Sequence, residues 1–172
     1  MKRFSYLFTQ YVTTSFLLLS ILYLFLKTTK LTVYSQQGYV FGSLFRMFLY
    51  HEQHSSQYLF LVSLVYACIA AAWSYRIGTT QKGLTRAVSI LCVMLLTLVV
   101  SSIPGGMLWV VHDVQAGFFP GVSQFLKALW WGATTGLVLG WMIFLLSIPF
   151  NIVCLFAGYW LTNYIEKRTR RL

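Results

Sequence analysis

Acidic residues are nearly absent from this chain. Only 3 of its 172 residues are Asp or Glu, against 13 Lys and Arg, and charged residues make up 9%. Soluble domains carry about 25% charged residues, because their surfaces must face water. With 58% hydrophobic residues, the composition instead predicts an integral membrane protein. The basic residues flank hydrophobic segments, so we attribute the net charge of +10 to topology and lipid headgroups and expect no nucleic-acid partner.

Motifs for catalysis and for disulfide bonding are missing as well. The sequence has no P-loop, no dinucleotide-binding fingerprint and no G-x-S-x-G motif. Its three cysteines, Cys68, Cys92 and Cys154, lie in hydrophobic segments and form no C-x-x-C pair, which argues against a disulfide framework. The residues therefore favour a protein that is not an enzyme.

Four hydrophobic segments organise the chain, at about residues 4–26, 58–75, 87–111 and 128–164. About 20 apolar residues of helix span a bilayer, so we predict an all-α integral membrane protein with four transmembrane helices in one domain, 1–172. The first segment resembles a signal peptide in its basic start. It ends in Leu24, Phe25, Leu26 and Lys27 without a small-residue cleavage site, so we expect it to be retained as a helix.

The last hydrophobic segment is too long for a simple span. As one helix, residues 128–164 would extend about 55 Å, against about 30 Å of hydrocarbon. A hairpin broken at Pro149 is one solution. The other is a single tilted helix, kinked at Pro149 and anchored by aromatic residues at both ends. The second solution is our prediction, because about 42 Å of helix from Trp131 to Tyr159 matches the thickness between the two interfaces. The run Pro104–Gly106 in the third segment is compatible with a kink or a break.

The connection between the first two spans contains a short amphipathic stretch, residues 39–50. Its apolar side chains include Phe41, Phe45 and Phe48, and we predict an interfacial helix that dips into lipid. With four spans, both termini and the middle loop share a side. That side carries nine Lys and Arg: Lys2, Arg3, Arg76, Lys82, Arg86, Lys167, Arg168, Arg170 and Arg171. The other side carries Lys27, Lys30, Arg46 and Lys127. The positive-inside rule predicts cytoplasmic termini, and we expect the plasma (inner) membrane.

Small residues recur at four-residue spacing in three of the segments. Such stripes let helix backbones approach closely in lipid, where no hydrophobic force drives helices together. The series are Gly132, Gly136 and Gly140; Ser63, Ala67 and Ala71; and Thr97, Ser101 and Gly105. We predict that the glycine series forms a zipper within the bundle or between this chain and a partner.

Polar residues that could bind a metal or a cofactor lie mostly on the predicted outer side. His51 and His54 stand three residues apart, with Glu52 between them, and His112 and Asp113 follow the third segment. These side chains have the types that bind a metal or ligate haem, but the spacing differs from H-E-x-x-H, and solvated interfacial residues are the simpler interpretation. The remaining acid, Glu166, lies in a basic tail, where we expect a local ion pair.

The leading functional hypothesis is a subunit or accessory factor of a larger membrane assembly, with the lipid bilayer and a homo- or hetero-oligomeric membrane partner. No cofactor is required by this hypothesis. One alternative is a haem- or metal-binding redox protein that uses the outer histidines. Another is a small-solute transporter or channel component, with a pore lined by hydroxyl residues such as Thr9, Thr13, Ser101 and Thr134.

Overall fold

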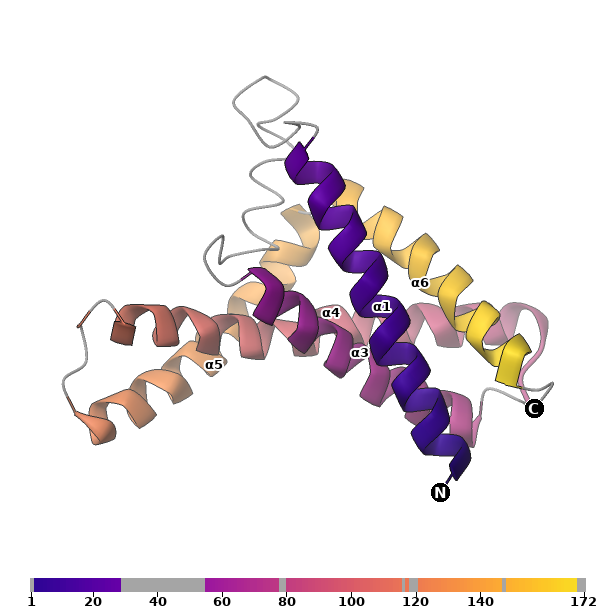
Figure 1. Cartoon of the computed structure of the whole chain (residues 1–172), viewed down its shortest axis with the longest axis horizontal. Coiled ribbons are helices and arrows are strands. Elements are labelled where there is room, and N and C mark those ends of the chain that lie inside the picture. The colour runs from indigo at the N-terminus through magenta and orange to yellow at the C-terminus, as the bar shows by residue number, and fades with distance from the viewer. Residues whose placement is uncertain are drawn as a thin grey trace.

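The computed structural model describes residues 2–28, 55–77, 80–115, 117, 121–146 and 148–169, and all of these are helical except residues 77, 80–82, 117 and 121 (Figure 1). The helices are α1 (Lys2–Thr28), α3 (Ser55–Arg76), α4 (Gly83–Gln115), α5 (Val122–Leu146) and α6 (Ile148–Thr169). These described segments contain no strand, which confirms the predicted all-α class.

Three of these helices are long and apolar enough to cross a membrane. The membrane-length stretches are Arg3–Phe25 in α1, Ser56–Arg76 in α3 and Gly83–Leu108 in α4. They coincide with the first three predicted segments to within a few residues, which agrees with the predicted integration into a membrane. The predicted interfacial helix, residues 39–50, lies outside the described residues.

The fourth predicted segment is two helices, and the prediction of one tilted helix is wrong. Helix α5 ends at Leu146, α6 begins at Ile148, and the two helices run in different directions (Figure 1). Proline disfavours helical geometry in the residue before it and cannot donate the backbone hydrogen bond of a helix interior. In the first turn of a helix the backbone N–H groups have no acceptor within the helix, so a proline there costs no hydrogen bond. Pro149 is the second residue of α6, so it marks the start of a helix and not a kink.

Helix α4, in contrast, continues through its proline. It runs from Gly83 to Gln115 with Pro104 inside, and its 33 residues extend about 50 Å. The helix ends where Gly117 takes a left-handed backbone (φ 86°) and donates its N–H to the Val114 carbonyl at 3.0 Å. Glycine adopts this conformation without steric cost. The far part of α4 therefore extends beyond its membrane-length stretch.

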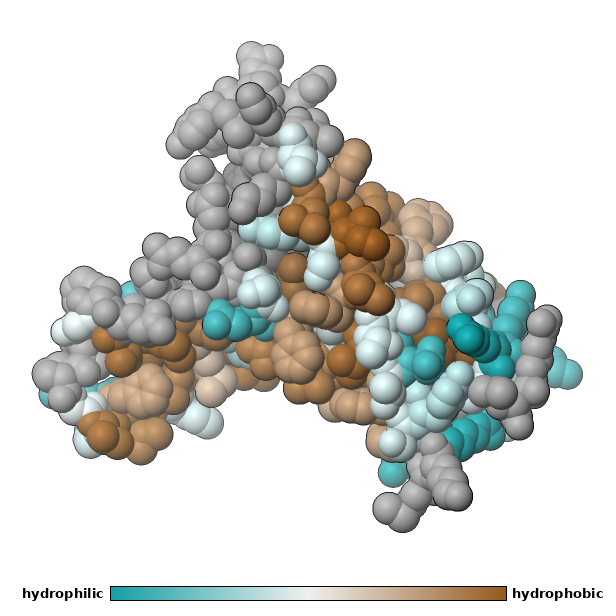
Figure 2. All heavy atoms as spheres, viewed as in Figure 1, coloured by the Kyte–Doolittle hydropathy of each residue, from teal (hydrophilic) through white to brown (hydrophobic). Residues whose placement is uncertain are grey.

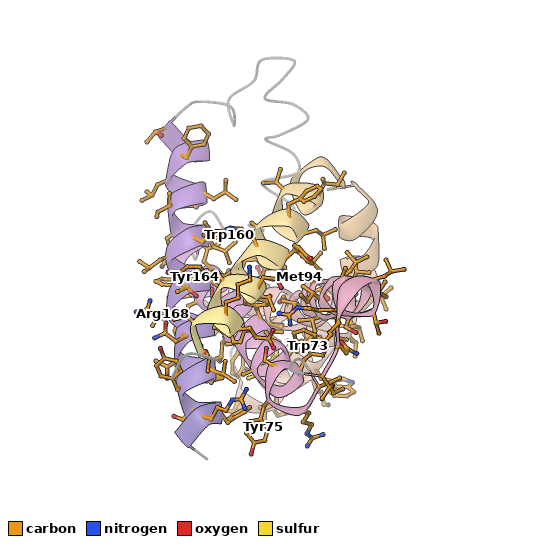
Figure 3. All side chains as sticks on the ribbon, turned by 90° about the vertical axis from the view of Figure 1, so that its right-hand side faces the viewer. Trp73, Tyr75, Met94, Trp160, Tyr164 and Arg168 are labelled. Atoms are coloured by element: carbon orange, nitrogen blue, oxygen red, sulfur yellow. The ribbon has the colours of Figure 1, made fainter. Side chains whose placement is uncertain are left out.

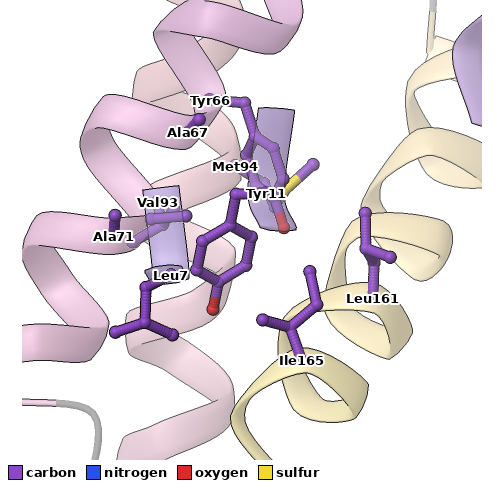
Figure 4. Close-up of a cluster of buried hydrophobic side chains, with 10 residues drawn as sticks. Leu7, Tyr11, Tyr66, Ala67, Ala71, Val93, Met94, Leu161 and Ile165 are labelled. Carbon is purple, nitrogen blue, oxygen red and sulfur yellow. The ribbon is translucent and has the colours of Figure 1, made fainter. Parts of the chain in front are cut away.

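Helices α1, α3, α4 and α6 form a bundle, and α5 packs along the second half of α4. The bundle core combines large side chains with three alanines of α3 (Figure 4). It consists of Leu7, Tyr11, Tyr66, Ala67, Ala70, Ala71, Val93, Met94, Leu161 and Ile165. The alanines leave room for Tyr11 and Tyr66, whose rings meet edge to face with centroids 5.5 Å apart.

Candidate functional site

Four helix ends meet at one end of the bundle: the starts of α1 and α4 and the ends of α3 and α6 (Figure 1). The rings of Phe4 and Tyr75 pack edge to face with centroids 6.0 Å apart, and the Tyr11 hydroxyl is 2.8 Å from that of Ser74. Hydrophilic residues gather there (Figure 2). We call this region the basic end, because many of them are Lys or Arg. Its basic residues are Arg3, Arg76, Lys82, Arg86, Lys167 and Arg168.

A buried ion pair joins two helices at the basic end. The Arg86 guanidinium on α4 contacts the Glu166 carboxylate on α6, and its Nε donates to Asn163 Oδ1 at 3.0 Å. The Glu166 side chain is 4% exposed and that of Arg86 is 15% exposed. This described partner of Glu166 lies 80 residues away and not in the tail, where the sequence predicts a local ion pair. Nothing in the spacing of the sequence indicated that these two residues meet.

Hydroxyl groups provide a second link between α3 and α6. Thr162 donates its only hydroxyl proton to the Gly158 carbonyl at 2.7 Å. The Tyr66 hydroxyl lies 2.7 Å from the same Thr162 oxygen, so Tyr66 must be the donor in that contact. Both residues are buried. Together with the ion pair, this bond holds the C-terminal half of α6 against the bundle.

Gly132 and Gly136 of α5 face α4. A Cβ added to Gly132 would lie 2.6 Å from the Gly106 carbonyl oxygen, and one added to Gly136 would overlap the Ser102 carbonyl and lie 3.1 Å from Gly106 Cα. Only glycine permits such close backbone approach. The α4 residue whose backbone lies close to both glycines is Gly106. It is not a member of the predicted small-residue series of α4, which is Thr97, Ser101 and Gly105. Its neighbour Gly105 instead lies against the Tyr58 ring, and the packing of Gly140 is outside the described part of α5.

The other small residues lie inside the bundle. Ala67 and Ala71 belong to the core, and Ser63 is buried with its hydroxyl on the Leu59 carbonyl at 2.8 Å. Thr97 and Ser101 are buried on α4. The two series therefore belong to internal faces of α3 and α4.

The outer-side polar residues are only partly described. His51, Glu52 and His54 lie outside the described residues, and so does the side chain of His112. Asp113 lies near the end of α4, far from the basic end along that helix. Among the described side chains, no three His, Cys, Asp or Glu residues come together as a metal site. The metal or haem hypothesis thus stays a prediction.

Two apolar cavities flank α6. One, of about 160 Å³, lies between α1, α3, α4 and α6, and its hydroxyl-bearing lining residues are Ser15, Thr97 and Tyr66. The other, of about 500 Å³, lies between α4 and α6. The hydroxyl residues suggested for a pore line neither cavity. These residues are Thr9, Thr13, Ser101 and Thr134.

The bundle thus offers a polar, positively charged end, two apolar cavities and an α4–α5 pair joined by glycine. Comparison of the chain with models of protein families, with curated proteins and with solved structures finds no match.

Proposed function

We propose that this chain is a non-catalytic subunit or accessory factor of a larger membrane assembly. Its contact with a membrane-embedded partner is the α4–α5 arm, by which we mean α5 together with α4 from Ser101 onward. The observation that carries the proposal is the one-sided packing of α5. This helix packs mainly on α4, and its outward side chains are large and apolar. They are Leu126, Trp130, Trp131, Leu137 and Val138.

The arm has the features of a protein contact surface. Its glycine face is already occupied by α4, so a partner would meet the opposite face, where Trp130 and Trp131 are 74% and 62% exposed. Tryptophan is enriched among residues that dominate binding energy at protein interfaces. Lys127 is the only charged residue of α5, so the exposed face of this helix is apolar. The partner that fits such a face is an apolar transmembrane helix.

The proposed topology has four crossings in the plasma (inner) membrane. In it, α1, α3 and α4 provide three, and α5 with α6 returns the chain to the side from which it started. Both termini then lie in the cytoplasm with the basic end, in line with the positive-inside rule. The shared location of the four helix ends supports this arrangement.

Site-specific photo-cross-linking in membranes tests the partner surface. A photoreactive amino acid replaces Val138 on α5 or, as the matched control, Leu17, which is similarly exposed on α1. We expect one adduct of defined mass from position 138 and none of that mass from position 17. An adduct with twice the mass of the chain would identify the partner as a second copy. Equal labelling at both positions, or a strictly monomeric protein that retains no other chain in mild detergent, would refute the proposal.

A further inference from the structure

The larger apolar cavity is a groove that starts near the basic end. It is lined by the N-terminal turns of α4 and the N-terminal half of α6, and its volume of about 500 Å³ is within the range of small-molecule sites. The lining residues are Leu84, Ala87, Val88, Ile90, Leu91, Met94, Ile152, Leu155, Phe156 and Tyr159. Only Tyr159 carries a polar group. Such a lining fits a hydrocarbon chain.

The shape of the groove follows from how α6 is attached. The helix is fixed near its C-terminus by Glu166 and Thr162, which contact α4 and α3 respectively. Toward its N-terminus α6 diverges from α4 (Figure 1). The groove begins at Leu84 in the first turn of α4 and continues to Met94 and to residues 152–159 of α6, so it leads from the basic end into the apolar part of the bundle.

Exposed basic residues lie at the basic end, where the groove starts beside the first turn of α4; we call this end of the groove its mouth. Lys82 precedes α4 by one residue, and Lys167 and Arg168 are exposed in the last turn of α6. The acid at this end among the described residues is Glu166, which is buried against Arg86. The exposed basic residues thus have no nearby described carboxylate to neutralise them, and an anionic headgroup would complement them.

An aromatic stripe on α6 sets the depth of this mouth in the membrane. Trp160, Tyr164 and Arg168 follow one another at four-residue spacing (Figure 3). The Trp160 and Tyr164 rings stack with centroids 5.5 Å apart and planes 14° from parallel. Exposed Trp and Tyr side chains favour the headgroup level of a bilayer. The stripe therefore places Lys167 and Arg168 where lipid phosphates lie.

We propose that the groove between α4 and α6 binds one acyl chain of an anionic phospholipid, with its phosphate beside Lys82, Lys167 and Arg168. The site combines an apolar groove, an uncompensated positive mouth and an aromatic marker of headgroup depth. The lipid site does not involve the α4–α5 arm, so this proposal can be tested independently of the proposed assembly partner.

Native mass spectrometry of the purified protein tests this site with two added lipids, phosphatidylglycerol and phosphatidylcholine of the same acyl chains. We expect phosphatidylglycerol to stay bound and phosphatidylcholine to be lost. The triple variant Lys82→Gln, Lys167→Gln, Arg168→Gln should weaken phosphatidylglycerol binding by roughly tenfold or more. Lys127→Gln, at the start of α5, is the matched control and should bind as the parent does.

A second pair of variants tests the groove itself. Val88→Trp fills it at an exposed position, and Leu17→Trp adds the same ring to the exposed face of α1, outside the groove. Circular dichroism and size-exclusion chromatography verify the fold. We expect Val88→Trp to lose phosphatidylglycerol and Leu17→Trp to retain it. Equal retention of both lipids, or phosphatidylglycerol binding that survives either the triple variant or Val88→Trp, would overturn the proposal.

Discussion

The backbone contact between α4 and α5 makes a specific prediction for Gly136→Ala. The added methyl group would meet the Ser102 carbonyl and the Gly106 backbone, neither of which can rotate away. Overpacking of this kind costs about 1–3 kcal/mol. Replacing a helical glycine by alanine returns about 0.5–1 kcal/mol of backbone entropy. Because the added carbon would overlap a backbone carbonyl, the steric cost falls in the upper part of the overpacking range, at about 2–3 kcal/mol, and the net loss in stability of the α4–α5 contact is about 1–2 kcal/mol.

Gly158→Ala provides the matched comparison, because Gly158 is also a glycine inside a helix at a contact with another helix. Its added methyl group would meet only the side chain of Met94, which has three rotatable bonds. Met94 and Gly158 both line the cavity of about 160 Å³, so the displaced atoms have space to enter. Steric cost and entropic gain should then nearly cancel, with no net change in stability.

Hydrogen–deuterium exchange in detergent micelles measures this difference locally. Peptides from α5 should exchange roughly 5- to 30-fold faster in Gly136→Ala than in the parent, while peptides from α1 and α3 keep their rates. Gly158→Ala should leave α5 unchanged. If α5 exchanges at the same rate in both variants, the glycine contact does not hold the arm to α4 and the reasoning is refuted.

Three further substitutions probe the bundle by thermal unfolding in micelles. Glu166→Ala should destabilise the bundle by about 3 kcal/mol, because Arg86 keeps its charge at a largely buried position. Adding Arg86→Met should recover most of that loss. A single variant as stable as the parent would contradict the buried ion pair. Tyr66→Phe should cost only about 1 kcal/mol, since Thr162 keeps its bond to the Gly158 carbonyl, whereas Tyr159→Phe at an exposed position should be neutral. Ala67→Leu should lower stability by about 1–3 kcal/mol, because the position is fully buried in the core beside Tyr66, and a stable variant would mean that the core is loosely packed.

The sequence predicted the membrane-length helices well and the contacts between them poorly. Hydropathy alone places α1, α3 and the membrane-length part of α4, because each carries an uninterrupted apolar run. It failed at residues 128–164, where length and aromatic anchors favoured one helix. Pro149 was assigned to a kink, yet a proline in the first turn is also how helices begin.

The polar contacts of the basic end were beyond prediction from one sequence. Arg86 and Glu166 were each identified as basic-side residues, but their pairing depends on how α4 and α6 cross, which no periodicity records. The glycines were easier, since four-residue spacing already selects a close-packing face of α5. Their contact Gly106 was missed because it is one position out of register with Thr97, Ser101 and Gly105.

Different interactions hold the α4–α5 arm together and attach α6 to the bundle. In lipid, apolar area alone gives little attraction between helices, so close backbone packing and hydrogen bonds must supply it. The arm relies on backbone contact at Gly132 and Gly136, whereas α6 relies on the Glu166 and Thr162 links near its C-terminus. A lesion in one part should therefore leave the other assembled. We therefore expect that variants of the arm abolish only the proposed partner binding, and that variants of the basic end abolish only the proposed lipid binding.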